Sequence, residues 1–209
     1  IALRLGECVV TESGFGADIG MEKFMDIKCR ASGLRPDCVV LVATIRALKM
    51  HGGAGNVVAG KPLPKELVDE NLVALEKGCA NLAAHIRIAR LFGVPVVVAV
   101  NRFATDTDKE TRLLEKAAMD AGATRAVMTD HWAKGGAGAE DLARATLEAC
   151  EQKKEFRFLY ELDTPIRDKI EIIATKVYGA DGVDFLPAAE KKLKLYTDDI
   201  PLFTRFQIE

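Results

Sequence analysis

The sequence predicts an α/β fold in which a mostly parallel sheet is flanked by helices. Strand-like and helix-like segments alternate along the 209 residues, and this order favours β-α-β units over a sandwich or a bundle. Four apolar, β-branched runs each end in a glycine-rich or polar loop. Since open α/β sheets bind ligands at the carboxyl ends of their strands, these loops predict one binding crevice. The runs are residues 8–11, 37–44, 94–100 and 125–129.

Helices are expected between these runs and after them. Apolar residues recur at three- and four-residue intervals from Leu72 to Ala89, which predicts one long helix over residues 65–91. Pro64 at its start and Gly93 at its end are typical helix boundaries. Further helices are predicted over residues 22–31, 108–121, 140–151 and 166–178, with a turn and a short helix over residues 178–196.

The charged segment EQKKE at residues 151–155 marks a predicted domain edge. Its charges are typical of a solvated junction rather than a binding patch. The chain is therefore expected to consist of an α/β core over residues 1–150 and a small helical appendage over residues 151–209.

Composition excludes several classes of partner. With 29 basic and 31 acidic residues the formal charge is −2, so we expect neither nucleic acid nor an anionic membrane as a partner. No run is long and apolar enough for a membrane span. The five cysteines show no CxxC or Cys/His spacing, which predicts reduced, mostly buried thiols and no metal site. The cytoplasm is the expected location.

The first loop, TESGFGADIG, places Gly14 and Gly16 on either side of Phe15. Such a loop lets backbone N–H groups approach an anion at the start of the next helix, although a purely structural turn is equally consistent. An aromatic residue at a flexible loop tip either contacts a ligand or packs back on the core. Both interpretations of Phe15 stay open.

The second loop contains Lys49, Gly52 and Gly53. Lys49 could neutralise a phosphate that the glycines allow to come close; alternatively, it is a solvent-facing lysine before a flexible connection. The nearby segment GNVVAGK matches most of a phosphate-binding P-loop motif. Pro62 follows this segment at the position where a Ser or Thr would hold magnesium, and no strand leads into the segment, so we interpret it as a surface loop.

The third loop, NRFATDT, holds an amide, an aromatic ring and a carboxylate. Asn101 either ends the strand or contacts a ligand, and Asp106 with Thr105 either contacts a ligand or caps the following helix. The fourth loop, DHWAKGGAGAE, carries the chain's one tryptophan, Trp132. A lone tryptophan is usually a core or lid residue, but this one lies among polar and glycine residues.

Phe15, Phe103 and Trp132 place aromatic rings after three predicted strands, although only 6% of the chain is aromatic. This pattern indicates a flat, conjugated ligand such as a pteridine or a nucleobase, held by stacking that contributes roughly 1–3 kcal/mol per ring. His51 and His131 are candidates for proton transfer.

These segments resemble the formate–tetrahydrofolate ligase family, also known as formyltetrahydrofolate synthetase. The resemblance rests on VVTESGFGADIGMEKFMDIKCRASG, VVLVATIRALKMHGG, FGVPVVVAVNRFATDT, HWAKGGAGAEDLA and DKIEIIATKVYGADGV. The resemblance covers about residues 1–197. The segments are most similar to the synthetase region of eukaryotic trifunctional one-carbon tetrahydrofolate synthases.

The resemblance implies a P-loop-NTPase-like core and a ligase that forms 10-formyltetrahydrofolate from formate, ATP and tetrahydrofolate through formyl phosphate. Magnesium would accompany ATP, a monovalent cation such as potassium or ammonium would support activity, and the intact enzyme would be a homo-oligomer. Phe103 and Trp132 match the aromatic pair that encloses the folate pterin, and Phe15 matches the aromatic residue of the first loop. Glu12, Asp18 and Lys49 match motif positions expected to contact substrate or phosphate, and they are the candidate catalytic residues. Phosphate or substrate loops would contain Gly14, Gly16, Gly52, Gly53, Asn101, Asp106, Gly135 and Gly136.

The chain also departs from the family pattern. The family's ATP-binding loop is expected upstream of Ile1, and the final DDIPLFTRFQIE does not follow the family's continuation. Ser13 and Arg102 also differ from the usual residues and could alter the pocket rim. We therefore expect a partial chain without its own P-loop, cytoplasmic unless an upstream mitochondrial segment was lost.

Two alternatives to a ligase remain open at this stage. One is a catalytically inactive folate-binding or regulatory fragment that associates with a full-length synthetase. The other is a nucleotide-binding protein in which residues 101–106 recognise a base. ATP binding without folate binding would favour the second.

Overall fold

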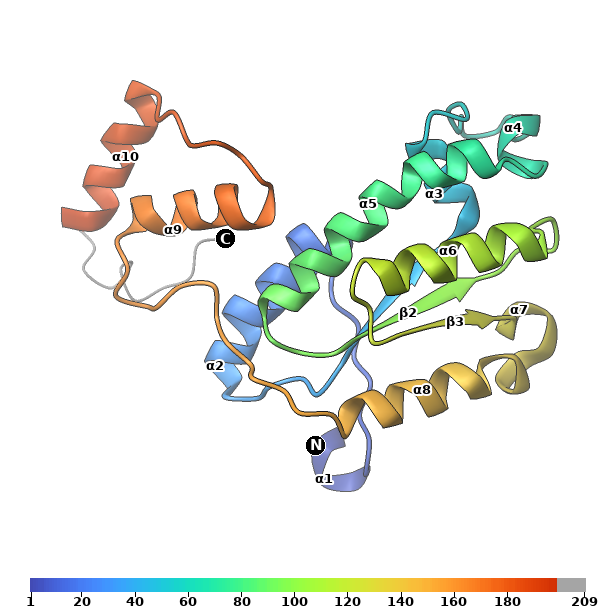
Figure 1. The fold of residues 1–209 in the computed structure, drawn as a ribbon. Coiled ribbons are helices and arrows are strands. Elements are labelled where there is room, and N and C mark those ends of the chain that lie inside the picture. Colours follow the sequence, from blue (N-terminus) through green and yellow to red (C-terminus); the bar gives the residue numbers. More distant parts are fainter. Residues whose placement is uncertain (199–209) are drawn as a thin grey trace. The chain divides into compact units, whose positions relative to one another are not determined.

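The computed structural model describes residues 1–198 (Figure 1), and the chain divides into two compact units. One unit is Arg35–Arg157; the other is formed by Ile1–Leu34 together with the chain from Phe158 onward. The predicted domain boundary at residue 150 stays a prediction, because compactness alone does not define a domain. Most of the atypical C-terminal tail lies outside the described residues.

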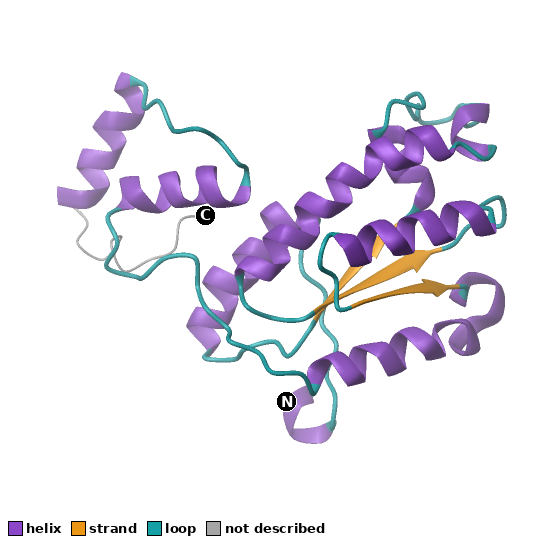
Figure 2. Cartoon of the chain, viewed as in Figure 1, coloured by secondary structure: helices purple, strands orange, loops and turns teal. Residues whose placement is uncertain are grey.

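The unit Arg35–Arg157 is built on a parallel sheet. Strands β1 (Val39–Ala43), β2 (Val96–Asn101) and β3 (Arg125–Thr129) lie in the order β1-β2-β3, and all their arrows point the same way (Figure 2). In the register, Val42 of β1 pairs with Ala99 of β2, and Val100 of β2 pairs with Met128 of β3. The predicted α/β class with a mostly parallel sheet is therefore confirmed.

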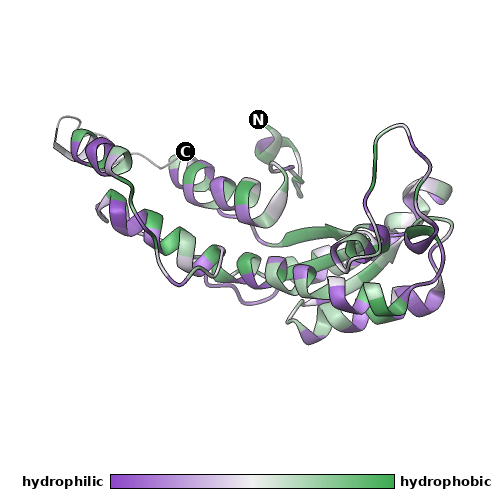
Figure 3. Ribbon diagram, turned by 90° about the horizontal axis from the view of Figure 1, so that it is seen from above, coloured by the Kyte–Doolittle hydropathy of each residue, from purple (hydrophilic) through white to green (hydrophobic). Residues whose placement is uncertain are grey.

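Helices cover both faces of this sheet (Figure 1). Because side chains alternate along a strand, Val98 and Val100 pack against one face while Val97 packs with Ala145 and Ala149 on the other. The first face is covered by α3 (Ile45–His51), α5 (Leu72–Leu91) and α6 (Asp108–Asp120), and the second by α8 (Glu140–Cys150). The strands are correspondingly apolar (Figure 3).

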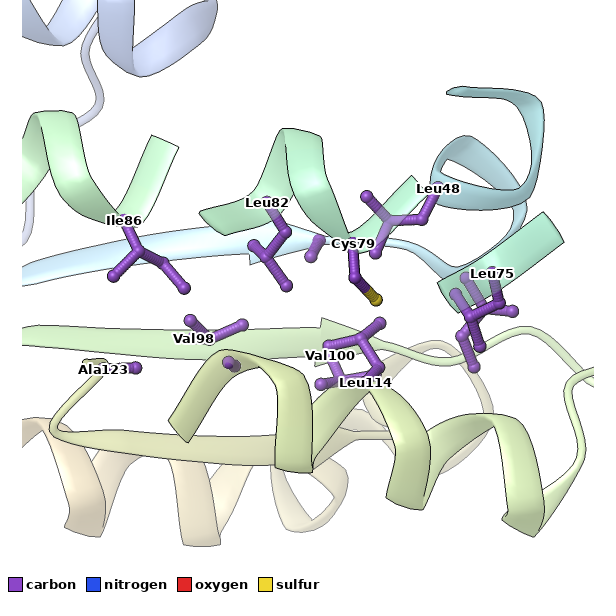
Figure 4. Close-up of a cluster of buried hydrophobic side chains, with 12 residues drawn as sticks. Leu48, Leu75, Cys79, Leu82, Ile86, Val98, Val100, Leu114 and Ala123 are labelled. Atoms are coloured by element: carbon purple, nitrogen blue, oxygen red, sulfur yellow. The ribbon is translucent and has the colours of Figure 1, made fainter. Parts of the chain in front are cut away.

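The larger core lies between β2 and the helices of the first face (Figure 4). Leu75, Ile86, Val98, Val100 and Leu114 are all completely buried there. Cys79 and Leu82 of α5 and Leu48 of α3 complete the contact between helices and sheet. Hydrophobic burial in this cluster fixes the sheet whose carboxyl edge carries the predicted loops.

The predicted helix over residues 65–91 is wrong as one element. It is divided into α4 (Lys65–Val68) and α5, and Asn71 between them adopts a non-helical φ of −144°. The Asn71 side chain accepts a hydrogen bond from Ala74 N at 3.1 Å, which makes it the N-cap of α5. An N-cap has non-helical backbone, so the helix cannot run through this residue.

Residues 45–51 belong to the predicted second loop, but they form the helix α3 instead. Thr44 caps it by accepting a hydrogen bond from Ala47 N at 3.2 Å. Ile45 and Leu48 are buried on its inner side. α3 packs closely on α5, since a Cβ at Gly78 would collide with the Leu48 carbonyl and one at Gly52 with the Ala74 carbonyl.

The second unit is helical. Its N-terminal part contains α1 (Ala2–Leu5), and the predicted strand over residues 8–11 is wrong, because these residues have no ladder partner and Val10 is 85% exposed. β-branched residues form strands only where a neighbouring strand and a packing surface exist. The remaining helices are η1 (Gly16–Met21), η2 (Phe24–Cys29), α2 (Arg30–Ser32), α9 (Ile166–Ile172), η4 (Ile173–Val177) and α10 (Pro187–Asp198).

The predicted helices at 22–31, 108–121, 140–151 and 166–178 are confirmed within one or two residues, except that the first begins earlier, at Gly16. All five cysteines are free, although only Cys29 and Cys79 are buried. Among residues 1–198, the helices are too short or too polar to cross a membrane.

Candidate functional site

The candidate site of the Arg35–Arg157 unit lies at the carboxyl edge of its sheet. Arg46 follows β1, Phe103 follows β2 and Trp132 follows β3. Because β2 lies between the other two strands, the loop of Phe103 occupies the middle of this edge. The parallel topology thus places these three post-strand segments along one edge, where open α/β sheets bind ligands.

Asp106 fixes the backbone of the Phe103 loop. Its carboxylate Oδ2 accepts a hydrogen bond from Phe103 N at 2.8 Å, and its own backbone N–H donates to the Phe103 carbonyl at 3.0 Å. Asp106 is only 4% exposed. Burial raises the pKa of its carboxyl group, while the hydrogen bond from Phe103 N and the charges of Lys49 and Arg46 oppose that rise.

The interpretation of Asp106 as a helix cap is wrong, because Thr107 caps α6. Thr107 Oγ1 accepts from Glu110 N at 3.3 Å and Glu110 Oε2 accepts from Thr107 N at 3.0 Å, which forms a capping box. Asp106 therefore stabilises the turn that contains Phe103 and does not cap α6. Arg102 also stabilises this turn, by donating to the Asp106 carbonyl at 3.2 Å and to Asp108 Oδ1 at 3.1 Å.

Arg46 stacks on Phe103. The Arg46 Cζ atom lies 4.1 Å from the centre of the Phe103 ring, and the ring remains 37% exposed. Sequence reasoning missed Arg46, since nothing in the order of residues indicates that the start of α3 reaches the loop after β2. Asn101, the last residue of β2, is half-buried and paired in register with Thr129.

Trp132 is 93% exposed, so it is not a core residue. It lies in α7 (His131–Lys134), a single turn that is followed by the 3-10 helix η3 (Gly135–Ala139). Lys134 pairs with Asp130 at 3.2 Å, and Gly135 has a φ of +59°. A large aromatic side chain left almost entirely in solvent is the kind of surface that a flat ligand can cover.

Lys49 is completely buried, so the interpretation as a solvent-facing lysine is wrong. Its Nζ atom donates to Glu110 Oε1 at 2.7 Å and to the Asp69 carbonyl at 2.9 Å. Glu110 also accepts from the backbone N–H groups of Asn71 and Thr107, both at 3.0 Å. Burial alone would raise the pKa of Glu110, but these hydrogen bonds hold it below its ordinary value.

Gly52 and Gly53 lie at the other end of α3 and line a surface cavity of about 520 Å³. Lys77, Asn71 and Glu66 also line this cavity, but Lys49 does not. Lys49 and the two glycines therefore do not line a common cavity, although the sequence predicted that they act together on one phosphate. The P-loop-like segment at 55–61 is an exposed loop, as expected.

The first glycine loop lies in the other unit and is folded on itself. A Cβ at Gly20 would collide with the Gly14 carbonyl, and Gly20 N donates to the Phe15 carbonyl at 3.1 Å. Phe15 is 98% exposed, which rules out the interpretation that it packs back on the core. Glu12 is also exposed and Asp18 is half-buried.

A pair of buried carboxyl groups in this unit also escaped sequence reasoning. Glu22 is 6% exposed and Asp26 is completely buried. Asp26 Oδ1 accepts from Leu159 N at 3.0 Å and lies 3.7 Å from Arg30 Nη2. Burial, reinforced by a hydrogen bond to Asp26, raises the pKa of Glu22 to about 8; burial also raises the pKa of Asp26.

We expect this pair to make the folded chain less stable as pH rises from 4.5 to about 8. Over that range the folded state keeps a proton on Glu22 that the unfolded state releases, and stability falls with pH where the folded state binds more protons. Glu22→Gln should make the free energy of unfolding depend less on pH. Near pH 8 this variant should be more stable than the unmodified chain. Urea unfolding across this range measures it, with Glu148→Gln as an exposed control; equal slopes for all three proteins would contradict the expectation.

Among residues 1–198, no group of three or more His, Cys, Asp or Glu side chains is placed to hold a metal ion.

Comparison with known proteins gives one consistent family. The family model described as "Formate--tetrahydrofolate ligase" matches residues 1–202. "Formate--tetrahydrofolate ligase" of Desulforamulus reducens is 63% identical over 198 residues, which cover 95% of this chain and 35% of that protein. The human "C-1-tetrahydrofolate synthase, cytoplasmic" is 57% identical over 189 residues, or 90% of this chain and 20% of the human protein.

The mouse "Monofunctional C1-tetrahydrofolate synthase, mitochondrial" is 56% identical over 200 residues, covering 94% of this chain and 20% of the mouse protein. The chain therefore spans about a third of the bacterial relative and a fifth of the mammalian ones.

Proposed function

The chain belongs to the formate–tetrahydrofolate ligase family, and from this premise we propose that it carries the folate-stacking part of an ATP-dependent ligase. The observation that supports this proposal is the carboxyl edge of the sheet. There the half-exposed ring of Phe103 and the exposed ring of Trp132 follow neighbouring strands. These rings would enclose the pteridine of tetrahydrofolate, with each contributing roughly 1–3 kcal/mol to its binding.

In the proposed reaction, ATP activates formate as formyl phosphate, and an amine nitrogen of tetrahydrofolate attacks its carbonyl carbon. Formation of the formyl phosphate releases ADP; a C–N bond then forms, the C–O bond to phosphate breaks, the amine nitrogen loses its proton, and phosphate leaves. The protein's task is to hold the labile anhydride next to the amine and to exclude water. The two hydrogen bonds between Asp106 and the backbone of Phe103 support this role, because ligand orientation requires a well-defined surface.

For the other predicted residues the support differs. Phe15, Glu12 and Asp18 are proposed as substrate-contacting residues on the family motif and, for Phe15, on its exposure. Asn101 is proposed to contact substrate because it ends the central strand at the carboxyl edge. For Lys49 we propose a supporting role, because direct contact with a phosphate would require breaking its buried pair with Glu110. Gly14, Gly16, Gly135 and Gly136 stay proposed substrate-loop residues.

Magnesium and a monovalent cation are proposed by family membership alone. The described residues form no cluster of ligands for a metal ion, so we propose that magnesium enters with the ATP phosphates and derive no step through it. Homo-oligomerisation of the intact enzyme is likewise proposed. The relatives' names include a cytoplasmic and a mitochondrial protein; we propose the cytoplasm for this chain, with the mitochondrion as the alternative.

Calorimetric titration of the chain with tetrahydrofolate tests the proposal. Trp132→Ala should weaken binding by roughly 1–3 kcal/mol, since it removes one stacking surface. Trp132→Phe keeps an aromatic face and should retain most of the affinity. Because Trp132 is 93% exposed, neither change should disturb the fold, which makes the affinity directly interpretable.

Unchanged affinity in Trp132→Ala would contradict the stacking site. A parallel titration with ATP separates the proposal from a nucleotide-binding function: binding of ATP with no binding of tetrahydrofolate would favour the latter. Binding of tetrahydrofolate without ligase activity would identify the chain as a folate-binding part of the enzyme.

A further inference from the structure

We propose that Arg46 is a positioning residue for the folate site, holding the Phe103 ring so that its opposite face receives the pteridine. This inference rests on the proposed function and adds a residue outside the aromatic pair. Arg46 comes from a different element, the first turn of α3.

The contact between the two side chains is a cation–π stack. The 4.1 Å between Arg46 Cζ and the ring centre is well inside the roughly 6 Å within which such contacts are attractive. A ring has two faces, and the guanidinium occupies one of them. Since Phe103 is still 37% exposed, part of the ring stays accessible to a second flat group.

Besides the Phe103 ring, Arg46 has an oppositely charged neighbour, because its charge opposes the rise in the pKa of the buried Asp106 carboxyl group. Within residues 1–198 it forms no ion pair, and its Nε atom is shielded from solvent without a hydrogen-bond partner. A buried N–H group without a partner costs free energy. The stack on Phe103, together with the attraction between the Arg46 and Asp106 charges, thus holds the guanidinium at the carboxyl edge of the sheet.

Arg46 and Asp106 constrain different parts of Phe103. Asp106 holds the backbone through two hydrogen bonds, at 2.8 and 3.0 Å, whereas the guanidinium restricts the orientation of the ring. A ring fixed before the ligand arrives loses less conformational entropy on binding. Arg46 therefore raises affinity without contacting the ligand.

A double-mutant cycle tests this mechanism by titrating the chain with tetrahydrofolate. Arg46→Met keeps a long apolar side chain but removes the cation, and we expect it to weaken binding about three- to tenfold. Arg46→Lys keeps a cation and should restore much of the affinity. With Phe103→Leu in place, adding Arg46→Met should cause no further loss, because Arg46 acts through the ring.

Each of the following outcomes would overturn the proposal. Unchanged affinity in Arg46→Met, or failure of Arg46→Lys to restore binding when both variants melt at the temperature of the unmodified chain, means that the cation does not position the ring. Full additivity in the double variant means that Arg46 contacts the ligand independently. If Phe103→Leu does not affect binding, or the unmodified chain binds no tetrahydrofolate, the proposed function itself fails and the inference fails with it.

Discussion

Lys49→Met should lower the free energy of unfolding by about 3–5 kcal/mol, because it leaves the Glu110 carboxylate buried without its counter-charge. Both side chains are completely buried and their charged atoms are 2.7 Å apart. The pair also connects three segments: α3 through Lys49, α6 through Glu110, and the break before α5 through the Asp69 carbonyl and Asn71 N.

Urea unfolding measures this loss, and Lys116→Met is the matched control. Lys116 makes an equally short contact with Asp120, at 2.6 Å, but both side chains are mostly exposed, so its removal should leave stability nearly unchanged. The double variant Lys49→Met with Glu110→Gln should recover part of the loss, since it removes the uncompensated buried charge and keeps a side-chain oxygen that can accept from the backbone N–H groups of Asn71 and Thr107. Equal stability of Lys49→Met and Lys116→Met would show that the buried pair does not form in solution.

The sheet was predictable because its signals are local. The run Val94–Val100 is rich in β-branched residues and is followed by a polar loop. It contains most of the central strand β2, in which residues 96–100 are buried. The parallel order then placed Phe103 and Trp132 at one edge, which is a general property of α/β sheets. Residues 8–11 have a similar composition but lie outside the sheet, where no neighbouring strand completes their hydrogen bonds.

The contacts that shape the candidate site were not predictable, because they join residues far apart in sequence. Lys49 could be recognised as a cation next to glycines, but its burial depends on Glu110, 61 residues later. Arg46 reaches Phe103 only because β1 and β2 are neighbours. The helix break at Asn71 likewise depends on a distant residue. The Asn71 side chain caps α5, and its backbone N–H donates a hydrogen bond to Glu110. Periodicity describes a helix face and carries no information on such tertiary partners.

The second large effect is expected in the core beneath the site. Leu114→Ala should destabilise the chain by about 2–5 kcal/mol, which combines lost burial with the cavity left behind. Leu114 is completely buried in α6 and belongs to the cluster that includes Val100 of β2 and Leu75 of α5 (Figure 4). Because α3 and α5 already approach each other as closely as Gly78 allows, the surrounding helices have little freedom to collapse into the cavity.

Leu147→Ala in α8 is the control for this change, because it removes the same atoms from a side chain that is 53% exposed. It should lose far less stability in urea unfolding, since surface substitutions stay within about 0.5 kcal/mol. Val100 belongs to the same buried cluster as Leu114 and directly precedes Asn101, so the cavity should also loosen the end of β2 that carries Phe103. Leu114→Ala should therefore weaken tetrahydrofolate binding under conditions where the chain is still folded. A variant that loses stability but keeps full affinity would mean that the Asp106 turn and Arg46 fix the ring independently of the core.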